Sequence, residues 1–120
     1  FLRGETLAQR IARTGPLVEG EVRALLPAIV AGLQAIHDAD VIHRDLKSHN
    51  IFLVDTNGDL PHVKVVDFGL ARPAAPLTPR TFSSASAIAG TPDFMAPEQI
   101  EGRPASPASD VYALGVVVFE

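Results

Sequence analysis

The sequence predicts an α+β fold that is mainly helical and contains one small β-hairpin. Apolar residues recur at steps of three and four between residues 19 and 37, which indicates one long amphipathic helix. Two short β-type runs at 51–54 and 62–68 flank the segment DTNGDLP, whose composition favours a hairpin turn. The apolar run at 111–119 is shorter than the roughly 20 residues that cross a bilayer. We therefore expect it to form a buried helix.

The first half of the chain also carries signals for where its helices begin and end. Thr6 is expected to cap a short helix that continues to about Arg13, and the segment TGP at 14–16 ends that helix. Pro27 lies within the long helix and has no amide proton to donate to Arg23. A kink in the long helix is therefore predicted at this proline.

The second half of the chain contains one long segment without periodicity. Residues 71–92 are rich in Ala, Pro, Ser and Thr, and they predict a mobile loop of a length that is usually functional in a compact domain. After this loop, the run MAPEQIEG at 95–102 predicts a short helix. Asp110 is expected to cap the final helix, because aspartate is a preferred capping residue. Earlier in the chain, VIH at 41–43 is one more short β-type run.

Composition excludes several classes of function. The chain has 120 residues, 47% of them apolar, and a net charge of −4, so no basic surface is expected to bind nucleic acid or anionic lipid. It contains no cysteine, which excludes disulfides and thiolate metal sites. The spacing of His37, His49 and His62 does not suit a metal site, and we expect these side chains to be surface or supporting groups.

The most informative segment is HRDLKSHN at 43–50, a polar cluster placed between the long helix and the hairpin. Two further motifs follow it in order, DFG at 67–69 and APE at 96–98. Together the three segments resemble the catalytic loop H-R-D-L-x-x-x-N, the D-F-G motif and the A-P-E motif of protein kinases. Each motif alone is a weak signal, but their order and spacing make chance a poor explanation.

The resemblance covers the whole chain and is to bacterial, eukaryotic-type Ser/Thr protein kinases. It implies that residues 1–120 form part of a kinase domain, from the end of the interlobe hinge to the start of the central helix of the C-terminal lobe. Residues 43–50 would be the catalytic loop and residues 67–98 the activation segment. The N-terminal lobe, with its glycine-rich loop and strand lysine, would be absent. We therefore expect a fragment that is inactive on its own.

The chemistry of phosphoryl transfer explains why these residue types occur together. The reaction needs a carboxylate that orients and deprotonates the attacking hydroxyl, and Asp45 suits this role. It also needs positive charge near the transferred phosphate, which Lys47 would supply. Asn50 and Asp67 offer oxygen ligands for Mg²⁺, or for Mn²⁺, bound to ATP.

The resemblance implies further roles in nucleotide binding and in control. Leu2, at the end of the hinge, and Phe52, beneath the adenine, are expected to contact ATP. Arg44 would receive a phosphate from the activation loop, since a guanidinium group pairs well with phosphate. The candidate phosphorylation sites in that loop are Thr78, Thr81, Ser83, Ser84 and Ser86.

Three other positions take their expected roles from the same resemblance. Thr91 would form part of the substrate platform, and together with Lys47 it favours Ser/Thr substrates over tyrosine. His43 is expected to pack beneath Phe68 instead of transferring protons. Asp40 stands in a turn where the family often has glycine, and aspartate tolerates that geometry better than most residues.

Three functions remain open at this point. The first is part of an active kinase that uses ATP and a protein substrate with a Ser or Thr acceptor. The alternatives are a catalytically silent kinase-like binding module and, less favoured, a small-molecule phosphotransferase. The resemblance also implies a cytoplasmic kinase domain, with no nucleic acid partner and no membrane contact from this segment. It leaves open whether the parent protein carries a membrane anchor.

Overall fold

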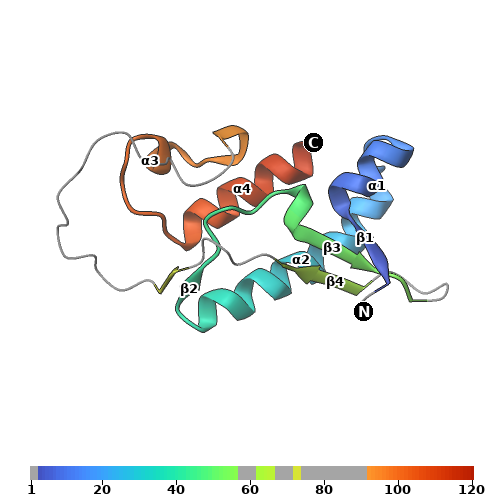
Figure 1. Ribbon diagram of the computed structural model, residues 1–120, viewed down its shortest axis with the longest axis horizontal. Helices are drawn as coiled ribbons and strands as arrows, with labels where there is room; N and C mark the ends of the chain where they lie inside the picture. The colour runs from blue at the N-terminus through green and yellow to red at the C-terminus, as the bar shows by residue number, and fades with distance from the viewer. Residues whose placement is uncertain (1–2, 57–61, 67–71, 74–91) are drawn as a thin grey trace.

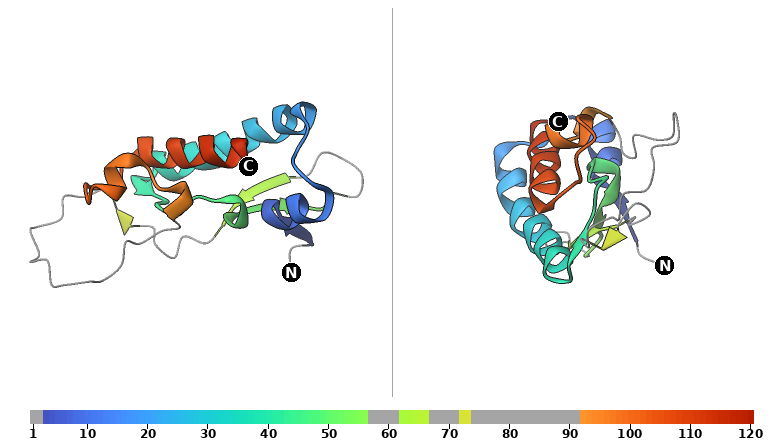
Figure 2. Two further views of the ribbon diagram at one scale, coloured as in Figure 1. Left: turned by 90° about the horizontal axis from the view of Figure 1, so that it is seen from above. Right: turned by 90° about the vertical axis from the view of Figure 1, so that its left-hand side faces the viewer.

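Two helices, α2 (Glu19–Asp38) and α4 (Pro107–Phe119), lie side by side. Together with a small antiparallel sheet they form the framework of the molecule (Figures 1 and 2). The computed structural model describes residues 3–56, 62–66, 72–73 and 92–120. The elements in chain order are β1 (Gly4–Thr6), α1 (Leu7–Thr14), α2 (Glu19–Asp38), β2 (Val41–Ile42), the 3₁₀ turn η1 (Ser48–Asn50), β3 (Ile51–Val54), β4 (His62–Val65), β5 (Arg72–Pro73), the 3₁₀ turn η2 (Pro92–Phe94), α3 (Pro97–Ile100) and α4 (Pro107–Phe119).

The strands form two sheets. The larger has the order β1-β3-β4 and is antiparallel throughout, with Phe52 of β3 opposite Thr6 on one side and Lys64 on the other. The predicted hairpin of β3 and β4 is therefore confirmed, although residues 57–61 of its turn lie outside the described residues. The predicted 71–92 loop is wrong at Arg72–Pro73, because these two residues pair with β2 as the short strand β5.

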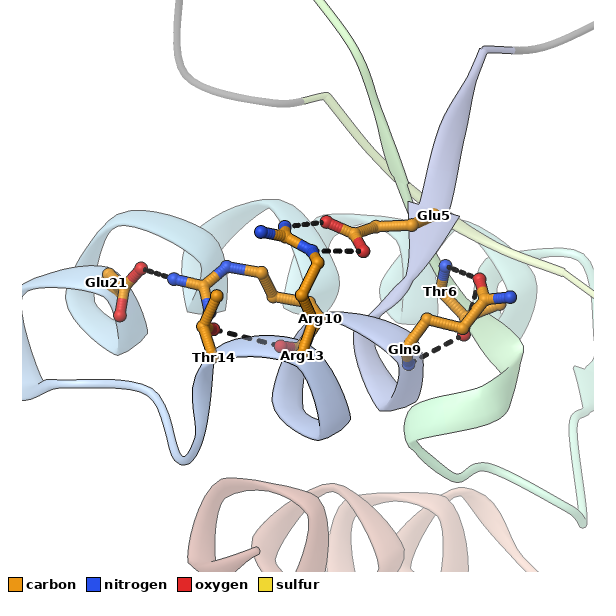
Figure 3. Close-up of polar contacts among 7 residues, drawn as sticks. All are labelled: Glu5, Thr6, Gln9, Arg10, Arg13, Thr14 and Glu21. Carbon is orange, nitrogen blue, oxygen red and sulfur yellow. Dashed lines mark hydrogen bonds and ion pairs between the residues drawn. The ribbon is translucent and has the colours of Figure 1, made fainter.

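The first helix begins where the sequence predicts. Thr6 Oγ1 accepts a hydrogen bond from the Gln9 amide at 3.2 Å, and Gln9 Oε1 accepts one from the Thr6 amide at 2.8 Å. These reciprocal bonds form a capping box, which supplies partners for two amides that the helix leaves unpaired (Figure 3). The helix ends at Gly15, whose φ of 84° suits glycine.

Ion pairs hold α1 against its neighbours (Figure 3). Arg13 donates from Nη2 and Nε to the two carboxylate oxygens of Glu5 in β1, at 2.5 and 3.3 Å. Arg10 pairs with Glu21 in the first turn of α2. The hydrogen bond from Arg13 holds the pKa of Glu5 below its ordinary value. These contacts connect the sheet, α1 and α2 at the surface.

The predicted long helix is confirmed and forms the main support of the larger sheet. Leu25, Ile29 and Leu33 recur every four residues on one buried face, which joins the hydrophobic core with residues of α1, β3 and α4. Pro27 lies on an exposed side of α2, and the helix continues through it. Because Pro27 is exposed, the hydrogen bond that it cannot donate is missing at the surface of α2 and not in the core. The kink at Pro27 stays a prediction.

The final helix begins earlier than the sequence suggested. Ser106 precedes the first turn and Pro107 opens it, which is the preferred position for proline in a helix. The prediction that Asp110 caps this helix is wrong, because Ser106 is the capping residue and Asp110 is the fourth residue of the first turn. Ala113, Leu114 and Val117 are buried against the core. The opposite side of α4 is exposed, with Phe119 exposed to 95%.

Candidate active site

The polar segment 43–50 lies between β2 and β3 and passes beside α4 (Figure 1). Two left-handed residues shape the backbone around it. Asp40 has a φ of 55° at the turn that ends α2, as expected for a position that glycine often occupies. Arg44 has a φ of 70°, which is uncommon for a residue with a side chain and persists only when neighbouring contacts impose it.

Asp110 supplies those contacts. Its Oδ2 accepts a hydrogen bond from the His43 amide at 2.9 Å, and its Oδ1 accepts one from the Arg44 amide at 2.9 Å. The side chain is only 1% exposed, so the two bonds form away from water, where they are strong. The first turn of α4 thus holds the strained backbone of the polar loop in place.

His37, expected to be a surface or supporting group, belongs to the same network. Its Nε2 lies 2.8 Å from Asp110 Oδ2, and its side chain is only 12% exposed. The contact joins the last turn of α2 to the first turn of α4. Sequence reasoning missed the link because the two residues are 73 positions apart.

His43 is fully buried, and its ring connects the loop to the segment after β4. Its Nδ1 accepts a hydrogen bond from the Asp45 amide at 3.3 Å, which assigns the ring proton to Nε2. Nε2 then donates to the Val66 carbonyl oxygen at 3.2 Å. These bonds fit a structural role for His43. The predicted packing against Phe68 lies outside the described residues.

Three predicted site residues lie together in the loop. Lys47 Nζ is 2.9 Å from Asp45 Oδ2, and both side chains are partly buried, with 23% and 16% exposure. Asn50 is buried, and its Nδ2 donates to the Asp45 carbonyl oxygen at 2.7 Å. This bond directs the amide nitrogen to the protein, so the carbonyl oxygen is the group of Asn50 that suits a metal ion.

The loop is also joined to the strand that leads to the predicted metal ligand Asp67. The Val66 amide donates to the Asn50 carbonyl oxygen at 2.8 Å, so residue 66 lies beside the loop. Asp67 itself is outside the described residues. So are seven other predicted site residues, which are Leu2, Thr78, Thr81, Ser83, Ser84, Ser86 and Thr91. Among the residues that are described, no group of three or more His, Asp or Glu side chains could hold a metal ion.

The remaining two predicted residues are described. Arg44 is partly buried, and its Nε is a buried donor without a partner among the described residues. Phe52 is also partly buried, and its ring lies beside Gly4, where an added Cβ would come within 2.8 Å of it. The expected roles of Arg44 in phosphate binding and of Phe52 in adenine binding stay predictions.

A pocket of about 840 Å³ opens next to the loop. Lys47, His49 and Asn50 line it on the loop side, and Asp93 and Phe94 of η2 line it on another. Val116, Phe119 and Glu120 at the end of α4 also line this pocket, so three side chains of the loop face a space between η2 and α4.

The family of the chain follows from comparison with known sequences. The protein kinase domain family matches residues 1–120, which is the whole chain. The chain belongs to the protein kinase family. The four described helices and the small antiparallel sheets fit part of a kinase domain.

Several bacterial proteins that are named serine/threonine-protein kinases are similar to this chain. It is 45% identical to Pkn1 of Myxococcus xanthus over 120 residues, which is all of this chain and 17% of Pkn1. It is 39% identical to the probable serine/threonine-protein kinase PknB of Corynebacterium glutamicum, over 99% of this chain and 18% of PknB. Identity to PknA of the same species is 42%, over all of this chain and 24% of PknA. The chain thus spans less than a quarter of these relatives. Within the described parts of the chain, no helix is long and apolar enough to cross a membrane.

Proposed function

We propose that the full-length protein carrying this chain transfers the γ-phosphate of ATP to Ser and Thr hydroxyls of proteins. The observation that supports this most directly is the arrangement of Asp45, Lys47 and Asn50. Lys47 Nζ lies 2.9 Å from the Asp45 carboxylate, and Asn50 is fixed to the Asp45 backbone at 2.7 Å. Kinase catalysis is mainly positioning and charge stabilisation, and it needs this set of groups.

Each residue takes one role in this proposal. Asp45 orients the acceptor hydroxyl and accepts its proton, while Lys47 places positive charge near the transferred phosphate. Asn50 and Asp67 would hold Mg²⁺, since amide and carboxylate oxygens are the ligands that this ion prefers. When bound, Mg²⁺ neutralises charge on the phosphates of ATP.

The finer assignments follow the family pattern. Residues 1–120 would form part of the kinase domain, in its C-terminal lobe, with the catalytic loop at 43–50 and the activation segment at 67–98. Leu2 and Phe52 would contact the nucleotide, and Thr91 would face the acceptor. Mn²⁺ could replace Mg²⁺ on the same oxygen ligands. A cytoplasmic location of the kinase domain also stays a prediction.

Control would act through Arg44. A phosphate on one residue of the activation segment would pair with the guanidinium group, whose Nε is buried without a partner among the described residues. The candidate acceptors of this phosphate are Thr78, Thr81, Ser83, Ser84 and Ser86. Arg44→Ala is expected to abolish any gain in activity that this phosphate gives.

Two substitutions in the full-length protein test the assignment of roles. Asp45→Asn is expected to lower phosphoryl transfer by orders of magnitude and to leave nucleotide affinity largely intact, because the carboxylate acts in the transition state. Asp67→Ala is expected to weaken Mg²⁺-dependent nucleotide binding more than Asp45→Asn does. Nucleotide titrations with and without Mg²⁺ separate the two effects. Near-normal turnover of Asp45→Asn would refute the role of Asp45, and equal nucleotide affinities would refute that of Asp67.

A further inference from the structure

A buried serine joins α3 to the first turn of α4. Ser109 is 1% exposed, and its Oγ accepts a hydrogen bond from the Ser106 amide at 2.9 Å. The same oxygen donates to Glu98 Oε1 at 2.5 Å. Because a hydroxyl group has one proton, the bond from Ser106 leaves that proton for Glu98. Ser109 therefore connects the start of α4 to α3.

The charge on Glu98 strengthens this connection. The hydrogen bond from Ser109 is the main cause that lowers the pKa of Glu98 below its ordinary value, so the carboxylate is ionised at neutral pH. Hydrogen bonds to an ionised acceptor are shorter and stronger than neutral ones. The Glu98 carbonyl oxygen also accepts from the Arg103 amide at 2.8 Å, which fixes the turn after α3.

The next residue of α4 holds the catalytic loop. Asp110 binds the His43 and Arg44 amides, as described above. Ser109 and Asp110 are neighbours in one helical turn, so a single rigid element positions both α3 and the loop that carries Asp45.

A third contact joins α3 to the loop directly. Gln99 Nε2 donates to the Arg44 carbonyl oxygen at 3.4 Å, and Gln99 Oε1 accepts from the Ala96 amide at 3.1 Å. The contacts Ser109 to Glu98, Asp110 to the loop amides, and Gln99 to Arg44 thus form a closed hydrogen-bond triangle. Arg44 precedes Asp45, so this triangle fixes α3 relative to the proposed base.

We propose that Ser109 and Gln99 are positioning residues for the protein acceptor. They hold α3, and with it the segment 92–96 that follows the proposed platform residue Thr91, at a fixed place relative to Asp45. This inference rests on the proposed kinase function. It concerns the acceptor and not the nucleotide, since the described contacts of both side chains are with α3, α4 and the Arg44 backbone.

The test measures steady-state kinetics of the full-length protein with casein, histone and myelin basic protein as acceptors. Ser109→Ala is expected to raise KM for the best acceptor by about tenfold, with KM for ATP changed less than about twofold. Ser106→Ala is the matched control, because its side chain makes no capping hydrogen bond and its amide is retained. It is expected to leave both values unchanged.

A double-mutant cycle separates positioning from general loosening of the fold. If Ser109 acts through Glu98, the acceptor KM of the variant with both Ser109→Ala and Glu98→Ala will equal that of Glu98→Ala alone. Additive effects, or equal increases in KM for acceptor and ATP, would overturn the proposed role of Ser109.

Gln99→Glu tests the other side of the triangle without altering α4, and it decides the matter if Ser109→Ala does not fold. It keeps the acceptor for the Ala96 amide and removes the donor to the Arg44 carbonyl. A raised acceptor KM at constant ATP KM supports the inference, and an unchanged acceptor KM refutes it. A wild-type protein that phosphorylates no acceptor refutes the proposed function itself. Wild-type activity with unaltered acceptor KM in Ser109→Ala and Gln99→Glu refutes the inference alone.

Discussion

Replacing Asp110 by alanine is expected to release the backbone of the loop at 43–50. The substitution removes the carboxylate that accepts hydrogen bonds from the His43 and Arg44 amides, each at 2.9 Å, and from His37 Nε2 at 2.8 Å. The side chain of alanine has no hydrogen-bond acceptor, so it cannot replace these bonds. Arg44 would then keep its left-handed φ of 70° without the contact that imposes it.

The size of the effect follows from the burial of these groups. Each buried donor that loses its partner costs about 1–3 kcal/mol, so two amides cost at least about 2 kcal/mol together. Because 1.4 kcal/mol corresponds to a factor of ten, opening of the loop should become at least about 30-fold more frequent. The His43 amide, which is the more deeply buried, should show the larger change.

Amide hydrogen exchange in the full-length protein measures this opening directly. Peptides that cover residues 41–46 should exchange at least about 30-fold faster in Asp110→Ala than in the wild type. Asp38→Ala is the matched control, since among the described residues that exposed carboxylate accepts only a local bond from Gln34 at 2.7 Å. A change of less than about threefold in Asp110→Ala would refute the reasoning, because it would mean that the amides keep equivalent partners.

Three further predictions concern stability. Gly4→Ala is expected to lower the free energy of unfolding by about 2 kcal/mol or more, because its Cβ would lie 2.1 Å from a backbone oxygen of β3. In the control Gly20→Ala, the added Cβ has no atom within 4 Å, so this substitution should raise the free energy of unfolding by about 0.5–1 kcal/mol. Equal effects of the two substitutions in denaturant titrations would argue against the clash. Ser48→Ala is expected to raise the melting temperature, since the Ser48 hydroxyl is fully buried without a hydrogen-bond partner among the described residues; a lower melting temperature would count against this. Arg13 lowers the pKa of Glu5, so the stabilisation from their contact is complete above the ordinary pKa of Glu5 and is lost as pH falls through the lowered value. Arg13→Ala should therefore lower the free energy of unfolding at neutral pH and not in strong acid. An effect that does not depend on pH would contradict this.

The helices could be predicted because their signals are local. Thr6 and Gln9 lie three positions apart and identify the start of α1 from sequence alone. The buried face of α2 is visible in its periodicity. For Asp110 the same local rule failed, because Ser106 and Pro107 already begin α4 and Asp110 is used elsewhere.

The contacts that join distant segments could not be predicted. Three such contacts connect residues far apart in sequence: β1 pairs with β3, β2 pairs with β5, and Asp110 binds the His43 and Arg44 amides. Neither strand propensity nor helix capping specifies a partner at such separation. These contacts depend on how α2 and α4 pack around one core.

The proximity of three candidate site residues could be predicted because they occur within one short loop. Asp45, Lys47 and Asn50 lie within six positions, and the structure brings all three together. What the loop sequence does not contain is its support, which comes from His37 and Asp110 on two different helices. The family motif therefore contains the proposed reacting groups and does not contain the residues that hold them.

Transfer of labelled γ-phosphate by the full-length protein tests the central claim most directly. The protein is incubated with Mg²⁺, γ-labelled ATP and an acceptor protein, and the labelled side chains are identified by mass spectrometry. We expect the label on serine and threonine hydroxyls of the acceptor, and we expect Asp45→Asn to lose this transfer while it still binds ATP. A protein that binds ATP but labels no hydroxyl, or an Asp45→Asn variant that labels as fast as the wild type, would contradict the proposed kinase function.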